Sequence, residues 1–165
     1  MRKSVKKLIK ELKHTSPEVR MHSAYELGEL ADPEAIDPLI LAVRDKDKKI
    51  RWRAAYALGE LGEKGYSKAY DAIINAFQEE ADWNVRRIIA LQLRYADARG
   101  TSLLIQALKD KSKFVRRYAA FALGESGDKR AIKPLQQALK DTSLEVRSYA
   151  AYALEKIAAK HGSLI

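Results

Sequence analysis

The chain of 165 residues lacks cysteine altogether. Disulfide bonds, thiolate catalysis and cysteine-ligated zinc are therefore excluded. Histidine is scarce as well, because only three occur, and no two of them have the spacing of metal ligands on one helix. No run of apolar residues approaches the roughly 20 that a membrane-spanning helix needs. We therefore expect no metal, no cofactor and no insertion into a membrane.

The amino-terminal residues 1–7 lead into alternating apolar and basic residues instead of the apolar core of a signal peptide. We expect no export signal, and a cytoplasmic protein is the simplest expectation. Asparagine occurs only twice, whereas lysine, arginine and glutamate are abundant. This composition favours a thermostable protein.

The formal net charge is +9, from 31 basic and 22 acidic residues. More than half of this excess of positive charge lies in residues 1–13, which contain six basic residues and a single glutamate. A basic chain suggests nucleic acid or an acidic surface as its partner. A solvated polar face on the first helix is the simpler interpretation, so the charge alone does not define a function.

At five positions spaced by 31, 35, 30 and 31 residues, a valine or isoleucine followed by arginine recurs within the same surrounding pattern. Repeats of this length are typical of stacked helix pairs. A good helix N-cap stands four positions before each arginine, and a leucine stands seven positions after it. The arginines are Arg20, Arg51, Arg86, Arg116 and Arg147, the caps are Ser16, Asp47, Asp82, Ser112 and Ser143, and the leucines are Leu27, Leu58, Leu93, Leu123 and Leu154.

A further helix precedes each arginine helix, because apolar residues recur there at the spacing of a one-sided helical stripe. No segment shows the alternation of a strand. A helix pair of this size cannot bury both of its faces, so the pairs must stack. The sequence predicts an all-α fold, a right-handed α-solenoid of five antiparallel helix pairs in a single domain 1–165, with pairs of roughly 1–31, 32–62, 63–96, 97–127 and 128–162. Because the third pair is longer, we expect an extended loop at residues 62–65.

The best-defined stretch, residues 115–125, reads VRRYAAFALGE and is followed by Gly127-Asp128 and by AIKPL at 131–135. These residues resemble the HEAT-like repeats, in the short form known from phycobilisome lyases, and they are also similar to artificial consensus repeats of that family. The resemblance covers essentially the whole chain. It implies the fold but no single function, because such repeats serve scaffolds, enzymes and nucleic-acid binders.

In that family the repeated arginine pairs with an aspartate at the end of the preceding helix, forming a ladder. The resemblance therefore implies structural pairs six residues apart: Asp45 with Arg51, Asp110 with Arg116, and Asp141 with Arg147. His14 stands at that offset in the first pair and Glu80 in the third. A row of phosphate-binding arginines is the alternative, weakened by the acidic neighbour of each arginine.

Four positions of each arginine helix point away from its buried side: one, two, five and nine residues after the arginine. These twenty positions hold 8 of the 13 aromatic residues, and tyrosine, tryptophan and arginine dominate the hot spots of protein interfaces. The alternative is that the rings pack laterally between neighbouring helices for stability. We predict a partner-binding concave surface formed by Tyr25, Trp52, Arg53, Tyr56, Arg87, Leu91, Arg117, Tyr118, Phe121, Tyr149 and Tyr152.

The function expected from these residues is non-catalytic binding of a protein or peptide. One alternative is a nucleic-acid-associated module that uses the basic turns and the concave arginines and rings. The twenty positions carry four basic and three acidic residues, however, and a surface for a phosphate backbone should be far more positive. The other alternative is an accessory subunit of a larger enzyme.

We expect no catalytic residues. The family includes an iron-dependent hydroxylase built on His-Glu steps, and this chain has no His-Glu dipeptide. On the last helix, Ala151, Leu154 and Ala158 are expected to face a neighbour that is missing. The chain is therefore expected to be a monomer or a weak dimer through its C-terminal helix.

Overall fold

A computed structural model describes residues 4–95 and 97–162. Within these ranges all regular structure is helical and no strand is found. The structure divides into two compact units, an amino-terminal unit up to Val85 and a carboxy-terminal unit from Arg86 onward. The all-α prediction is confirmed, and each unit is described by itself.

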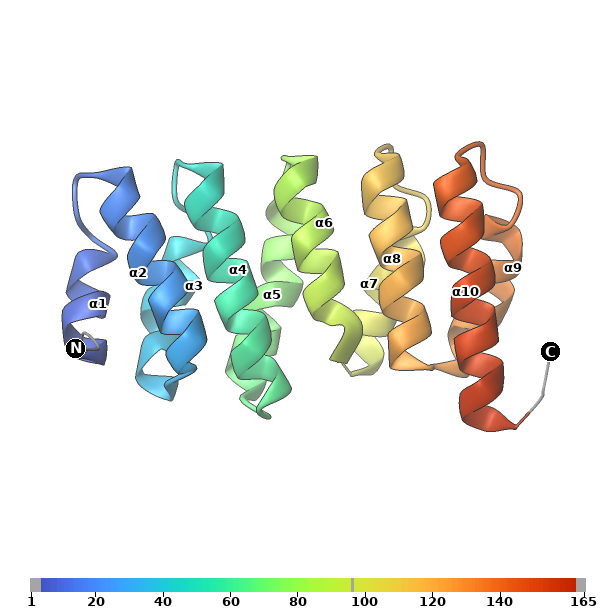
Figure 1. Cartoon of the computed structure of the whole chain (residues 1–165), viewed down its shortest axis with the longest axis horizontal. Coiled ribbons are helices and arrows are strands. Elements are labelled where there is room, and N and C mark those ends of the chain that lie inside the picture. Colours follow the sequence, from blue (N-terminus) through green and yellow to red (C-terminus); the bar gives the residue numbers. More distant parts are fainter. Residues whose placement is uncertain (1–3, 96, 163–165) are drawn as a thin grey trace. The chain divides into compact units, whose positions relative to one another are not determined.

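The amino-terminal unit contains α1 (Val5–Glu11), α2 (Pro17–Leu30), α3 (Ile36–Ala42), α4 (Lys48–Glu63) and α5 (Ser67–Glu79). A 3-10 turn at Pro33–Ala35 leads into α3. Helices α2 and α4 pack side by side, and α1 and α3 pack against them as their pair partners. In Figure 1, α3 and α5 lie in a second layer behind α2 and α4. The expected helix pairs are present here.

Helix α6 (Trp83–Gln92) crosses the boundary between the units and continues into a 3-10 turn at Leu93–Tyr95. The carboxy-terminal unit goes on with α7 (Ala98–Ala107), α8 (Lys113–Ser126), a 3-10 turn at Lys129–Ala131, α9 (Ile132–Ala138) and α10 (Leu144–His161). The pairs α7–α8 and α9–α10 are each in contact, and α8 packs along α10. We call α2, α4, α6, α8 and α10 the arginine helices.

The expected N-caps precede the arginine helices. Ser16 Oγ accepts the backbone N–H of Val19 at 3.4 Å, and Asp47 Oδ1 accepts that of Lys49 at 2.8 Å. Asp82 accepts two backbone N–H groups at the start of α6. Ser112 and Ser143 have the extended backbone of an N-cap without a side-chain bond. The N-cap residues therefore mark where each arginine helix begins.

The repeated leucines form the core of each unit. Leu27, Leu58, Leu93 and Leu123 are at most 1% exposed. Leu154 is 7% exposed, so the expectation that it faces a missing neighbour is wrong. It lies on the side of α10 that packs within the unit.

The expected extended loop at residues 62–65 is wrong as well. Helix α4 continues to Glu63, and only Lys64–Tyr66 connect it to α5. The extra length lies in the helices, since α5 has 13 residues whereas α3 has 7. A Cβ on Gly62 would lie 2.8 Å from the ring of Tyr70. Gly62 is therefore a packing residue inside the helix, and the turn is made by Gly65, whose φ is +94°.

Candidate functional site

A ladder of arginines crosses the turns of the amino-terminal unit. Arg20 on α2 donates from Nε to Asp45 Oδ2 at 2.8 Å and from Nη2 to Oδ1 at 3.1 Å. Its Nη1 donates to the carbonyls of His14 and Thr15 at 2.9 and 3.0 Å. Arg51 on α4 makes the same bidentate contact with Glu80, from Nε to Oε2 at 2.7 Å and from Nη2 to Oε1 at 3.2 Å. Each guanidinium therefore joins its own turn to a carboxylate of the next pair.

The carboxy-terminal unit repeats this geometry. Arg86 Nη2 lies 2.7 Å from Asp110 Oδ2. Arg116 donates to Asp141 at 2.7 and 2.8 Å and to the carbonyl of Asp110 at 2.9 Å. Arg147 donates to the carbonyls of Asp141 and Thr142 at 2.8 and 3.2 Å. Carboxylate and carbonyls thus occupy different edges of the planar guanidinium group.

The pairing differs from the one that the resemblance implied. The side chains of Asp45, Asp110 and Asp141 bind the arginine of the preceding pair, not the arginine six residues later. For Arg51, Arg116 and Arg147, the group at that offset is the backbone carbonyl of the aspartate. A backbone carbonyl is present whatever the side chain, which explains why His14 is tolerated before Arg20. Glu80 serves in place of an aspartate because its carboxylate accepts hydrogen bonds from both Nε and Nη2 of Arg51.

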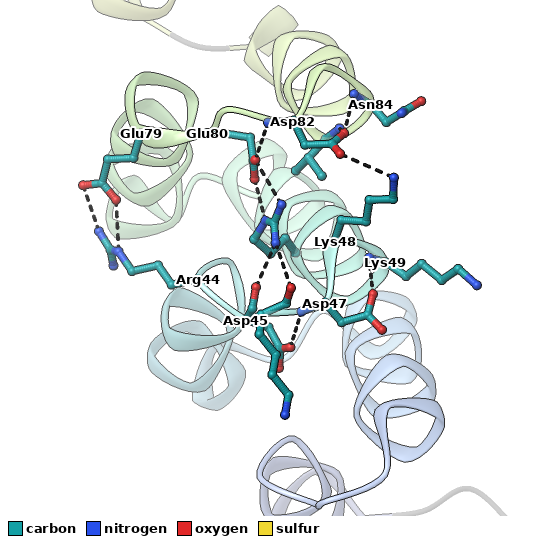
Figure 2. A network of polar contacts seen from close by, with 12 residues as sticks. Arg44, Asp45, Asp47, Lys48, Lys49, Glu79, Glu80, Asp82 and Asn84 are labelled. Carbon is teal, nitrogen blue, oxygen red and sulfur yellow. Dashed lines mark hydrogen bonds and ion pairs between the residues drawn. The ribbon is translucent and has the colours of Figure 1, made fainter.

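Each ladder carboxylate also fixes its own turn. Asp45 Oδ1 accepts the backbone N–H of Asp47 at 2.8 Å, and Glu80 Oε1 accepts that of Asp82 at 2.8 Å. Asp141 does the same for Ser143. Figure 2 shows two of these turns in the amino-terminal unit, one with Asp45 and Asp47 and the next with Glu80 and Asp82. The ladder therefore has a structural role, because its hydrogen bonds hold neighbouring helix pairs in alignment.

These contacts lower the pKa of two aspartates. Burial raises the pKa of Asp45, but hydrogen bonds from Arg20 and from the N–H of Asp47 outweigh it and bring the pKa below its ordinary value. For Asp141, the hydrogen bond from Arg116 is the largest cause of a lowered pKa. Since the ionised forms are favoured by folding, their stabilisation is present above the unfolded-state pKa of about 3.9 and is lost as the pH falls through the folded-state pKa.

We expect Asp141→Asn to lower the free energy of unfolding by about 1–2 kcal/mol at pH 7, because an amide replaces the ionised acceptor of Arg116. The variant should also lose less stability than the unchanged protein as the pH falls below about 4, because it lacks the carboxylate whose lowered pKa favours the folded state in the unchanged protein. Urea unfolding followed by circular dichroism at several pH values measures both effects. Asp37→Asn, at the exposed pair with Lys68, is the control and should leave the pH profile unchanged. Parallel profiles for Asp141→Asn and the unchanged protein would contradict the prediction.

The predicted partner-binding residues of the amino-terminal unit lie on α2 and α4 and form what we call the Trp52 surface: Tyr25, Trp52, Arg53 and Tyr56. The guanidinium of Arg53 lies 4.0 Å from the ring centroid of Trp52 and 5.0 Å from that of Tyr25. Tyr25 and Tyr56 are 41% and 36% exposed. Trp52 and Arg53 are half-buried. The cation stacked on two rings fixes this part of the surface.

The remaining predicted residues lie on α6, α8 and α10 of the carboxy-terminal unit and form what we call the Phe121 surface: Arg87, Leu91, Arg117, Tyr118, Phe121, Tyr149 and Tyr152. Phe121 stacks on Tyr152, with centroids 5.9 Å apart and planes 10° apart, and meets Tyr149 edge-on at 6.0 Å. Tyr118 accepts a hydrogen bond from Arg87 Nη1 at 3.3 Å. A hollow of about 120 Å³ opens among Leu91, Arg117, Tyr118, Phe121 and Tyr149.

None of the eleven predicted residues is buried. Tyr25, Tyr56 and Tyr149 are exposed, and the other eight are half-buried. The lateral packing that was the alternative also occurs, since Phe121 on α8 meets both tyrosines of α10. The rings therefore pack against the neighbouring helix with one part of their surface and face solvent with another.

Phe114 also belongs to this surface, although it was not predicted, because its ring centroid lies 5.5 Å from the guanidinium of Arg117. The signal was present, because a residue two positions before the arginine lies at about 160° on the same wheel, between the columns that were chosen. The corresponding residues of other pairs, such as Glu18 and Lys49, are polar, so that column did not draw attention.

Within residues 4–95 and 97–162, no three histidine or acidic side chains come together as a metal site would require. None of the helices in this part of the chain has the length and apolar character needed to cross a membrane.

Comparison with known proteins identifies the repeat. The family model for HEAT repeats matches residues 5–94 and 101–163. The chain belongs to the HEAT-repeat family. The HEAT repeats thus include the pairs that carry the ladder and both aromatic surfaces. No curated protein sequence matches the chain at a significant level.

Solved structures with the same fold include natural and engineered proteins. A chain from the complex of CpcE and CpcF of phycocyanin lyase from Nostoc sp. PCC7120 is 25% identical, with a TM-score of 0.79 over 96% of this chain. This chain spans 66% of the length of that one. An engineered protein is 26% identical, with a TM-score of 0.61 over 96% of this chain and 80% of the other.

A designed armadillo repeat protein in complex with the peptide (KR)4 is 17% identical, with a TM-score of 0.65 over 91% of this chain and 80% of the other. At this identity the likeness concerns the fold alone. Together with the HEAT-repeat match, these structures show that the chain has the all-helical solenoid fold of stacked repeats.

Proposed function

We propose that this HEAT-repeat protein is a non-catalytic scaffold that binds a protein or peptide through the Trp52 and Phe121 surfaces. The observation that carries the proposal is the stacking of arginines on rings that remain partly exposed. Arg53 lies over Trp52 and Tyr25, and Arg117 lies over Tyr118 at 5.0 Å and Tyr149 at 5.9 Å. Rings and guanidinium groups of this kind are the most frequent hot-spot residues of interfaces.

The stacking also lowers the entropic cost of binding. An interface residue that must be immobilised costs about 0.5–1.5 kcal/mol. In the Phe121 surface, Phe121 is already held by Tyr149 and Tyr152, and Tyr118 by Arg87. Side chains that are ordered before the partner arrives give more affinity for the same contact area.

The size of the hollow in the Phe121 surface favours a peptide side chain over a small ligand. It measures about 120 Å³, whereas pockets for small molecules usually have about 300–1,000 Å³. The hollow is lined by the side chains of Leu91 and Phe121, by the rings of Tyr118 and Tyr149, and by the guanidinium of Arg117. One side chain of an extended peptide or of a protein loop fits such a site.

A second candidate is the accessory subunit of an enzyme. It is favoured by the likeness to a chain of the complex of CpcE and CpcF of phycocyanin lyase, at 25% identity. In that case the partner would be the catalytic subunit, and the same two surfaces would hold it. The two candidates therefore differ in the partner and share the surface.

Nucleic-acid binding has less support from the contacts. The ladder arginines are engaged by carboxylates, as in the pair of Arg51 and Glu80 at 2.7 Å. Basic residues at the turns are partly neutralised too, since Lys48 lies 3.5 Å from Asp82 and Arg44 lies 3.1 Å from Glu79. A phosphate backbone requires cations that are free to replace its counterions.

The proposal is tested by selecting 12-residue peptides from a random display library on the intact chain. We expect each selected peptide to lose at least about tenfold in affinity with Trp52→Ala or with Phe121→Ala, because truncating a hot-spot ring costs about 2 kcal/mol or more. Calorimetric titration measures the affinities. Asn75→Ala on α5 and Gln137→Ala on α9, both exposed, are the controls and should change nothing. Failure to select any peptide, or sensitivity to the controls alone, would overturn the proposal.

A further inference from the structure

We propose that the hollow of the Phe121 surface recognises an acidic peptide, with an apolar side chain in the hollow and a neighbouring Asp or Glu carboxylate on Arg117. This inference rests on the proposed function and names the chemistry of the partner. Three observations carry it: the unused donors of Arg117, the balance of charges around the hollow, and the apolar lining.

Arg116 and Arg117 are adjacent in sequence and differ in their partners. Arg116 uses its donors on Asp141 and on the carbonyls of Asp110 and Lys111. Within the described residues, the guanidinium of Arg117 has no acceptor at hydrogen-bond distance, and its nearest carboxylate oxygen, on Glu145, lies 4.0 Å away. Its side chain is 24% exposed. Arg117 also lines the hollow, so a guanidinium without a bonded acceptor stands in its wall.

Arg117 is nevertheless held in place. Its guanidinium lies 5.0 Å from the ring centroid of Tyr118, 5.5 Å from that of Phe114 and 5.9 Å from that of Tyr149. Stacking on rings leaves the N–H groups in the guanidinium plane free to donate. A planar fork fixed in this way matches a carboxylate, which accepts two parallel hydrogen bonds from it.

The charges around the hollow are positive. Arg87 and Arg117 approach the ring of Tyr118 to 5.4 and 5.0 Å. No acidic residue lines the hollow. The two nearby glutamates are already paired with lysines, Glu145 with Lys113 at 3.3 Å and Glu125 with Lys156 at 3.4 Å. An anionic partner therefore complements this surface, whereas a basic peptide would be repelled.

The lining requires an apolar group next to the anion. Leu91 and Phe121 contribute hydrocarbon, and Tyr118 and Tyr149 contribute ring faces. An aliphatic side chain buried there gains free energy for each methylene removed from water. Since Arg117 stands in the same wall, the acidic residue of the peptide must lie beside the apolar one.

The experiment uses peptides selected on the intact chain, made with acetylated amino ends and amidated carboxyl ends so that only side-chain carboxylates are present. Selected peptides that bind the Phe121 surface should share an Asp or Glu beside a Leu, Ile, Val, Met or Phe. Arg117→Gln, and replacement of that acid by its amide, should each weaken binding at least about tenfold, and together no further. Arg117→Lys, which keeps the charge without the fork, should recover only part of the affinity. Lys133→Gln on α9, exposed, is the matched control.

The outcomes separate this inference from the proposed function. Peptides that depend on Phe121 but carry no acid, or that lose less than about threefold with Arg117→Gln, would overturn the inference and leave the proposed function standing. Peptides that depend on neither aromatic surface would overturn both. Circular dichroism of each variant shows whether it is folded, and Arg117→Lys serves as the second variant if Arg117→Gln is not.

Discussion

Arg116→Ala is expected to lower the free energy of unfolding by about 2–4 kcal/mol. The side chains of Arg116 and Asp141 are only 14% and 12% exposed, and they are joined by two hydrogen bonds. Removing the guanidinium leaves the carboxylate of Asp141 partly desolvated without its cation. It also removes the donor to the carbonyl of Asp110. Urea unfolding followed by circular dichroism measures the loss.

The chain offers a matched control for this prediction. Arg147 makes the same two carbonyl contacts, but no carboxylate binds it within the described part of the chain. Arg147→Ala should therefore cost less than about 1 kcal/mol, the value of a typical hydrogen bond. Equal losses for the two variants would mean that the carbonyl contacts, and not the bridge between pairs, provide the stability.

Gly124→Val is expected to cost about 3 kcal/mol, because α8 and α10 approach each other at this residue. A Cβ on Gly124 would lie 2.7 Å from Cα of Ala153 and 2.9 Å from its Cβ. The first of these atoms belongs to the backbone of α10, so it cannot move without shifting the helix. Thermal and urea unfolding of the variant measure the effect.

The glycine at the same position of α2 is the control. A Cβ on Gly28 would lie 3.1 Å from Cβ of Ala57 and 3.3 Å from its Cα. The smaller overlap is offset by the gain of about 1 kcal/mol that alanine brings to a helix in place of glycine. Gly28→Ala should therefore stay within about 0.5 kcal/mol of the unchanged protein, and Gly124→Ala should fall between the two variants. A Gly124→Val protein as stable as Gly28→Ala would show that α10 moves freely.

The positions of the arginine helices were predictable because the residues that define each helix lie within that helix. The N-cap Ser16, Arg20 and Leu27 all belong to one helix, so their spacing in the sequence is enough to locate α2. The exposure of Tyr25 and Tyr56 could be predicted for the same reason, because a helical wheel uses the sequence of one helix only. The arrangement of the arginine helices within each unit followed from the repetition of these columns.

The contacts between pairs were less predictable. Spacing places Asp45 six residues before Arg51, but the side chain of Asp45 turns toward Arg20 on the neighbouring helix. That choice depends on how α2 packs beside α4, which no single-helix pattern contains. The length of α4 is not evident from the sequence, because a glycine such as Gly62 is typical of a turn, whereas here it makes room for the ring of Tyr70.

The direction of the ladder has a consequence for how such arrays lengthen. In each rung the cation comes from one pair and the anion from the next, as for Arg116 and Asp141. A duplicated pair therefore brings one cation for its successor and one anion for its predecessor. Inserting it between two existing pairs would leave no ladder charge unmatched, so gene duplication can lengthen such an array without creating an unpaired ion at the new junction.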